Sequence, residues 1–198
     1  MSITLSYSTH GSSEVNLVES APSGDPAPVV KRSPSAEFDP APMYDIIELF
    51  FFAYRDFVGD ADRLLENYKF GRAHHRVLHF VNRQPGLKIA EILGILQITK
   101  QSLGRVLKDL LETGYIEVRP GRVDRRQRLL FPTSKGRILA LDLARLQSKR
   151  FARVFESLPP GAYDQAVQFL LEMIDPKDRS AIAERLLLNS LAPARQRA

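Results

Sequence analysis

A short charged segment, residues 124–128, lies between two runs of β-forming residues, 115–118 and 128–131. A Pro-Gly pair after the first run favours a turn, so the pattern predicts a β-hairpin with a charged tip. About twenty residues upstream, an amphipathic helical pattern begins at Thr99. A helix of this kind fits the major groove of DNA, and arginines at a hairpin tip fit an adjacent minor groove. The order of helix and hairpin therefore predicts one small domain with two basic elements that could contact DNA.

Composition supports a polyanionic partner. The 198-residue chain has a net charge of +5, but residues 1–42 hold two basic residues against five acidic ones, a net −3, so the remainder carries +8. A basic body with an acidic tail favours nucleic acid as the partner of the body. The chain has no cysteine, which excludes disulfides, thiolate metal sites and thiol redox sensing.

Three regions differ in character. Residues 1–42 are rich in Ser, Pro and Gly, and such a segment buries too little apolar surface to fold, so we expect a disordered acidic tail. Residues 43–175 are expected to form the main domain, and residues 176–198 a C-terminal helix and basic tail that aid dimerisation. No apolar run is long enough to cross a bilayer and no signal peptide is evident, so a cytoplasmic location is expected.

Hydrophobic periodicity predicts a mainly α chain with one small β-hairpin. The segment 43–58 is apolar on all sides, and its three consecutive phenylalanines at 50–52 need cover on more than one face, which a partner subunit would provide. Further helices are expected at residues 71–83, 87–96, 100–113, 134–155, 162–174 and 176–188.

The helix that begins after Thr99 is the first candidate for reading DNA. Leucines and a valine fall on one face, whereas polar and basic side chains fall on the other. Thr99 is a good N-cap, because its hydroxyl can accept the backbone N–H of Gln101 or Ser102. The candidate DNA-binding residues of this helix are Thr99, Lys100, Gln101, Ser102, Arg105 and Lys108.

Two motifs resemble the MarR family of bacterial transcription regulators. Residues 92–103 are similar to its turn and the start of its recognition helix, and residues 124–136 (DRRQRLLFPTSKG) resemble its wing signature, an Asp-x-Arg tip followed by Thr-x-x-Gly. The sequence departs from the family pattern at Gln97, where a small turn residue is usual, and at Pro132, where Leu is common. The resemblance implies a winged helix-turn-helix fold and a homodimer formed through the N- and C-terminal helices.

The wing is the second candidate for DNA contact. Residues 99–137 hold ten cations against four anions, so most of the excess positive charge is concentrated here. Arg126 is the favoured minor-groove residue, and Asp124 is expected to orient an arginine rather than to touch DNA. The simpler alternative is a solvated charge run on a surface hairpin. The candidate wing residues are Arg122, Asp124, Arg125, Arg126 and Arg128.

A small-molecule site is a further hypothesis. Tyr44, Tyr54, His75 and His79 combine aromatic rings with titratable groups, and relatives in the resembled family bind small aromatic effectors near such helices. His75 and His79 are four residues apart, a spacing that also suits a shared zinc ion, but no acidic partner is identifiable, so no metal or other cofactor is expected.

Together these features predict a sequence-specific regulator that binds double-stranded DNA as a homodimer at a pseudo-palindromic operator. Repression relieved by a small effector is the expected mode of action. The alternatives are a winged-helix adaptor whose hairpin binds an acidic protein, and a zinc-responsive regulator. No nucleophile, base and orienting carboxylate form a catalytic set, and no glycine-rich phosphate loop is present, so an enzyme is not expected.

Overall fold

A computed structural model describes residues 42–121 and 123–195, without the side chains of residues 188–195. The expected disordered tail therefore lies outside the described residues, apart from residue 42, and so does Arg122 of the wing. The elements are α1 (Tyr44–Glu66), α2 (Arg72–Arg83), β1 (Leu87–Lys88), α3 (Ile89–Leu96), α4 (Lys100–Glu112), β2 (Ile116–Pro120), β3 (Arg128–Pro132), α5 (Ser134–Glu156), α6 (Ala162–Glu172) and α7 (Pro176–Arg195).

The architecture is mainly helical with one small antiparallel sheet, as the sequence predicted. The sheet has three strands in the order β1-β3-β2, not the two of a simple hairpin. The prediction that a helix starts at Leu87 was wrong, because Leu87 and Lys88 pair with Leu130 and Leu129 of β3. Helix α3 begins only at Ile89, where the Glu91 carboxylate accepts the backbone N–H of Lys88 at 2.7 Å.

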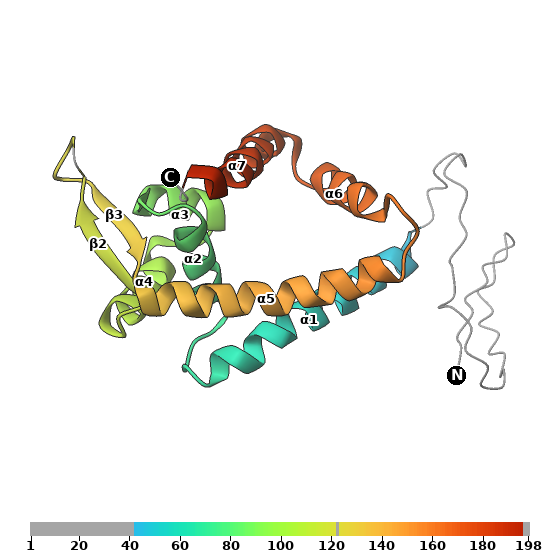
Figure 1. Ribbon diagram of the computed structural model, residues 1–198, viewed down its shortest axis with the longest axis horizontal. Helices are drawn as coiled ribbons and strands as arrows, with labels where there is room; N and C mark the ends of the chain where they lie inside the picture. The colour runs from blue at the N-terminus through green and yellow to red at the C-terminus, as the bar shows by residue number, and fades with distance from the viewer. Residues whose placement is uncertain (1–41, 122, 196–198) are drawn as a thin grey trace, which may run out of the picture. The chain divides into compact units, whose positions relative to one another are not determined.

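Helix α2 lies at the centre of the domain. It contacts α1, α3, α4, α5 and β3, and its residues Val77, Leu78 and Val81 are almost fully buried. Leu65 of α1 and Leu143 of α5 are buried in the same core. This arrangement holds the helix-turn-helix of α3 and α4 and the β2–β3 hairpin in one rigid lobe, from which the hairpin projects (Figure 1).

The turn before α4 accommodates the unusual Gln97. This residue adopts the left-handed conformation, with φ of 51° and ψ of 41°, at the C-terminus of α3. Its side-chain amide donates to the carbonyl of Gly94 at 2.8 Å. A left-handed residue is a normal helix terminator, although glycine or asparagine adopts it at less cost.

The C-terminal end of α4 is fixed to the start of α5. Gly114 has φ of 72° and ends the helix, as the sequence predicted. The Thr133 hydroxyl donates to the Gly114 carbonyl at 2.7 Å and accepts the N–H of Gly136 at 3.1 Å. One threonine thus caps α5 and connects it to Gly114, just beyond the end of α4.

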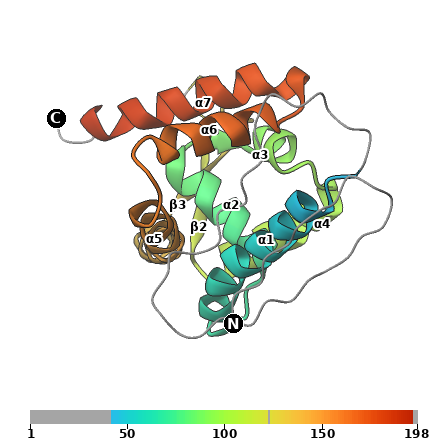
Figure 2. The same cartoon turned by 90° about the vertical axis from the view of Figure 1, so that its right-hand side faces the viewer.

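Helix α1 keeps much apolar surface exposed. It runs alongside α5 (Figure 1), which covers part of it, yet Phe50, Phe51 and Phe52 remain 44%, 65% and 53% exposed. Helices α6 and α7 contact each other (Figure 2) and also expose large apolar side chains, including Phe169 and Leu187. From the sequence we expect a second chain to cover this surface, and the exposed side chains are compatible with that expectation. Within residues 42–121 and 123–195 no helix combines the length and apolarity that a membrane span requires.

Candidate nucleic-acid interface

The start of α4 is held by the N-cap that the sequence predicted. The Thr99 hydroxyl oxygen accepts the backbone N–H of Ser102 at 3.1 Å, and its proton is donated to the Ser102 hydroxyl at 2.9 Å. Both residues are exposed but are engaged with each other. The cap leaves the remaining N–H groups of the first turn directed outward, where the positive end of the helix dipole favours phosphate.

The polar face of α4 is solvent-exposed over its whole length. Lys100, Gln101, Arg105 and Lys108 are all exposed, whereas Leu103, Val106, Leu107 and Leu110 are buried on the opposite face. Lys108 lies 3.9 Å from Glu112, an open and exposed pair that phosphate can replace at little cost. All six residues predicted for this helix and its N-cap are therefore accessible to solvent.

The wing tip is shaped by Asp124. Its carboxylate accepts the backbone N–H of Arg126 at 2.9 Å, and the hairpin is closed by Gly121 N–H to Gln127 carbonyl at 3.0 Å. Bonds from an aspartate to the N–H two residues later stabilise tight turns. Arg125, Arg126 and Arg128 are exposed. Asp124 thus shapes the turn that carries Arg126, and its predicted role beside DNA stays a prediction.

Substitution of Asp124 should separate turn geometry from charge. Asp124→Asn keeps an oxygen that can accept the Arg126 N–H and removes a negative charge, so we expect DNA affinity to be unchanged or higher. Asp124→Ala removes the same charge but also the bond, and we expect DNA affinity about tenfold below that of Asp124→Asn. Fluorescence anisotropy with a labelled operator duplex measures both. Equal affinities of the two variants would contradict the role of this turn.

Two cations counted in the sequence belong to the scaffold. Arg119 lies over the Phe131 ring at 4.6 Å and bonds Glu117, which holds it along the hairpin. Lys135 donates to the carbonyl of Thr113 at 3.0 Å and lies over the Tyr115 ring. A lysine at a helix C-terminus neutralises the exposed carbonyls there. These two side chains position α4 and the wing.

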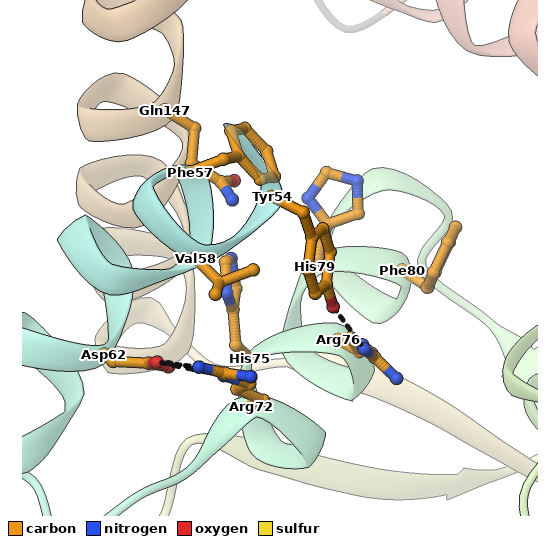
Figure 3. Close-up of a pocket in the computed structure, with 10 residues that line it drawn as sticks. All are labelled: Tyr54, Phe57, Val58, Asp62, Arg72, His75, Arg76, His79, Phe80 and Gln147. Atoms are coloured by element: carbon orange, nitrogen blue, oxygen red, sulfur yellow. Dashed lines mark hydrogen bonds and ion pairs between the residues drawn. The ribbon is translucent and has the colours of Figure 1, made fainter. Parts of the chain in front are cut away.

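A second site is a cavity of about 310 Å³ between α1, α2 and α5 (Figure 3). It contains Tyr54, His75 and His79 of the predicted effector cleft, but Tyr44 does not line it and is 56% exposed. Tyr44 is at the first position of α1, ten residues before Tyr54, and its place in an effector cleft stays a prediction. The lining residues are Tyr54, Phe57, Val58, Asp62, Arg72, His75, Arg76, His79, Phe80 and Gln147.

Two arginines that line this cavity were not predicted from the sequence. Arg72 forms an ion pair with Asp62 at 2.8 Å, and Arg76 donates to the Tyr54 hydroxyl at 3.0 Å. Figure 3 shows the two arginines on consecutive turns of α2. Arg72 and Arg76 are four residues apart, as are His75 and His79, and this spacing places the side chains on one face of α2. That spacing is the signal by which the two arginines could have been found in the sequence. Arg76 thus bonds a phenol hydroxyl, whereas Arg72 is paired with a carboxylate.

The two histidines of the cavity favour the neutral form. Burial lowers the pKa of His75 below its ordinary value, and the neighbouring His79 and Arg76 also lower that pKa, whereas Asp62 partly offsets them. Burial and then Arg83 lower the pKa of His79. Within the described residues, no cluster of three or more His, Cys, Asp or Glu side chains has a geometry suited to a metal ion.

The lowered histidine pKa values predict acid sensitivity. Protonation of these two histidines is less favourable in the folded state than in the unfolded chain. The stability that the neutral histidines provide is therefore fully present above the unfolded pKa near 6.5, and it is lost as the pH falls through the folded pKa. We expect the melting temperature to fall more between pH 7.5 and 5.5 in the native protein than in the His75→Asn/His79→Asn double variant. The same fall in both proteins would show that these histidines do not drive the effect.

Comparison with known proteins agrees with this geometry. The model of the MarR family matches residues 68–127. The HTH-type transcriptional regulator PetP of Rhodobacter capsulatus is 44% identical over 133 residues, which cover 67% of this chain and 80% of that protein. Among solved structures, FabT of Streptococcus pneumoniae in complex with DNA superposes with a TM-score of 0.60 at 16% identity, over 67% of this chain and 94% of FabT. The S. aureus MepR–DNA complex gives a TM-score of 0.53 at 20% identity, over 64% of this chain and 94% of MepR. At these identities the solved structures establish the winged helix-turn-helix fold.

Proposed function

The chain belongs to the MarR family of transcription regulators, and from that premise we propose that it is a homodimeric repressor that leaves a pseudo-palindromic operator when a small aromatic effector binds. Members of this family regulate transcription and are not enzymes, which agrees with the lack of a catalytic set in the sequence. The FabT and MepR structures named above contain DNA bound to the same fold.

One observation carries the DNA-binding part of the proposal. The lobe built around α2 exposes Lys100, Gln101 and Arg105 on α4, and Arg125 and Arg126 at the wing tip. Arginine suits guanine edges and glutamine suits adenine edges in the major groove. Arginine at a wing suits the enhanced negative potential of a narrow minor groove.

The exposed apolar residues of the terminal helices support a dimer. Phe51 of α1, Phe169 of α6 and Leu187 of α7 are each more than half exposed, which is costly in a monomer. A two-fold dimer buries the same patch on both chains and presents two α4 helices to two half-sites of an operator. The predicted contribution of residues 176–198 to the dimer is part of this proposal.

The cavity beside α2 supports a small effector of one chemical class. Phe57, Val58 and Phe80 offer apolar and aromatic contacts, and Arg76 offers a positive charge beside the Tyr54 hydroxyl (Figure 3). A small aromatic molecule with a negative charge matches this lining. Because α2 lines the cavity and also contacts α4, an effector that moves α2 would change the separation of the two α4 helices and lower the affinity for the operator.

The proposal is tested by measuring DNA binding and mass together. Purified protein is mixed with duplex fragments from its own promoter region, and sedimentation gives the stoichiometry of free and bound protein. We expect a dimer that binds one duplex and whose affinity falls steeply with salt. A monomer that ignores every fragment in dilute buffer but captures an acidic protein would instead favour a winged-helix adaptor.

The effector part is tested by ligand-induced stabilisation. Aromatic carboxylates such as benzoate should raise the melting temperature and weaken operator binding, whereas acetate should not. Arg76→Met should abolish the shift, and Tyr54→Phe, which keeps the arginine charge, should retain most of it. If operator affinity does not respond to any aromatic acid or phenol, release by this class of effector is wrong.

A further inference from the structure

A polar contact between two side chains joins α2 to the recognition helix α4. The His74 Nε2 lies 3.1 Å from the Asp109 carboxylate, across thirty-five residues of sequence. We propose that His74 is a positioning residue for DNA recognition, which fixes the rotation of α4 and thereby sets the ratio of specific to non-specific DNA affinity. The proposal rests on α4 as the DNA-reading helix.

The hydrogen bonds define which nitrogen of His74 carries the proton. The backbone N–H of Gly71 donates to the His74 Nδ1 at 3.1 Å, so Nδ1 is an acceptor without a proton. In the neutral ring the proton therefore resides on Nε2, which donates to Asp109. The same imidazole thus caps the start of α2 and reaches across to α4.

The imidazole is held rigidly by its surroundings. The Phe70 ring stacks on it with centroids 4.8 Å apart and an angle of 11° between the planes. Phe70 in turn contacts the edge of Tyr115, which follows α4. The His74 side chain is only 15% exposed, whereas the Asp109 side chain is 52% exposed. The donor is therefore fixed in the core lobe, and the acceptor is carried by the surface of α4.

This contact supplies a restraint that the rest of the α4 interface lacks. Lys135 and Thr133 fix the residues after α4, and Leu103, Val106 and Leu110 pack its buried face. Apolar packing is non-directional and tolerates small rotations of a helix, whereas a hydrogen bond has a required direction. Among the described residues, α4 forms an ion pair within itself, Lys108–Glu112, and one with another helix, His74–Asp109.

Rotation of α4 would affect the two components of DNA affinity unequally. Hydrogen bonds to base edges need donors and acceptors in defined places, whereas attraction to phosphates depends mainly on the number of positive charges. Loss of the His74–Asp109 bond should therefore lower operator affinity and leave affinity for unrelated duplex almost unchanged. A residue needed only for stability would not alter that ratio in the fraction of protein that is folded.

Two replacements of His74 separate its two bonds. In His74→Asn the amide oxygen lies where Nδ1 was and can still accept the Gly71 N–H, but the side chain is too short to reach Asp109. In His74→Gln the longer side chain places an amide N–H near the position of Nε2, so it can donate to Asp109, although the cap is lost. We expect His74→Asn to lower the specific-to-nonspecific ratio about tenfold, and His74→Gln to restore it at least in part.

Asp109 gives a second test that does not depend on the core. Asp109→Ala removes the acceptor, and Glu112→Ala removes the same charge from the same exposed side of α4 without touching α2. Both losses of negative charge should raise non-specific affinity equally. We expect only Asp109→Ala to lower the ratio, and Asp109→Asn, which keeps an accepting oxygen, to preserve it.

The measurement uses the full-length protein, an operator obtained by selection from a random duplex library, and a scrambled duplex of the same length. An unchanged ratio in His74→Asn and Asp109→Ala would overturn the proposal, and so would a lower ratio in His74→Gln than in His74→Asn. Failure of the native protein to select any sequence would instead contradict specific DNA binding itself. The two failures are therefore distinguishable.

Discussion

Gly136→Ala is expected to destabilise the protein by about 3 kcal/mol, at the upper end of the cost of overpacking. A Cβ atom at this buried position would lie 1.9 Å from the Tyr115 carbonyl oxygen, far inside van der Waals contact. That oxygen also accepts the backbone N–H of Thr133 at 3.1 Å, so it cannot move without loss of this bond. Either the first turn of α5 or the segment after α4 must shift.

Gly104→Ala is the matched control for this prediction. Gly104 is in α4, and a Cβ there would meet nothing within 4 Å. Because glycine costs roughly 0.5–1 kcal/mol relative to alanine inside a helix, this variant should be slightly more stable than the native protein. Urea unfolding followed by circular dichroism measures both. A Gly136→Ala variant as stable as Gly104→Ala would show that α5 can move away from Tyr115.

The close approach at Gly136 gives a physical reason for part of the sequence motif. The Thr-x-x-Gly pattern at residues 133–136 predicted the start of a helix, but it did not reveal that the helix starts against the backbone that leaves α4. The threonine joins the two segments, and the glycine lets them touch. Local patterns of this kind predict helix ends well, because capping depends on neighbouring residues.

Contacts between distant residues could not be predicted in the same way. The third strand was missed because Leu87–Lys88 is too short to show an alternating pattern, and its pairing with β3 depends on the tertiary fold. The Arg72 and Arg76 positions in the cavity, and the His74–Asp109 bond, likewise require α1, α2 and α4 to be placed in space. His74 is next to His75 in the sequence, although its side chain bonds a different helix.

The charge pattern predicted an exposed basic surface, but it did not predict the role of each cation. Exposure of Arg105 and Arg126 agrees with the proposed contacts. Arg119 and Lys135 have the same charge but bind Phe131, Glu117 and Tyr115 within the chain. Net charge alone cannot separate these groups, because aromatic and carboxylate partners are brought to them only by folding.

Arg126→Ala is expected to weaken operator binding by at least tenfold, since a guanidinium in a narrow minor groove makes contacts worth about 1–3 kcal/mol and a dimer would lose two of them. Arg126→Lys keeps the charge but loses the planar fork, so it should recover only part of the affinity. Fluorescence anisotropy at several salt concentrations gives both the affinity and its salt slope, which should become shallower in Arg126→Ala.

Arg119→Ala is the control that makes this result specific. It removes the same charge from the same hairpin, but the Arg119 guanidinium lies over Phe131 and bonds Glu117, so it is less available to DNA. We therefore expect a smaller loss of affinity than in Arg126→Ala. Equal losses would mean that the hairpin acts only through its total charge. If Arg126→Ala and Arg105→Ala both left operator affinity unchanged, the DNA-binding face would lie elsewhere, because neither the wing nor α4 would then contact the duplex.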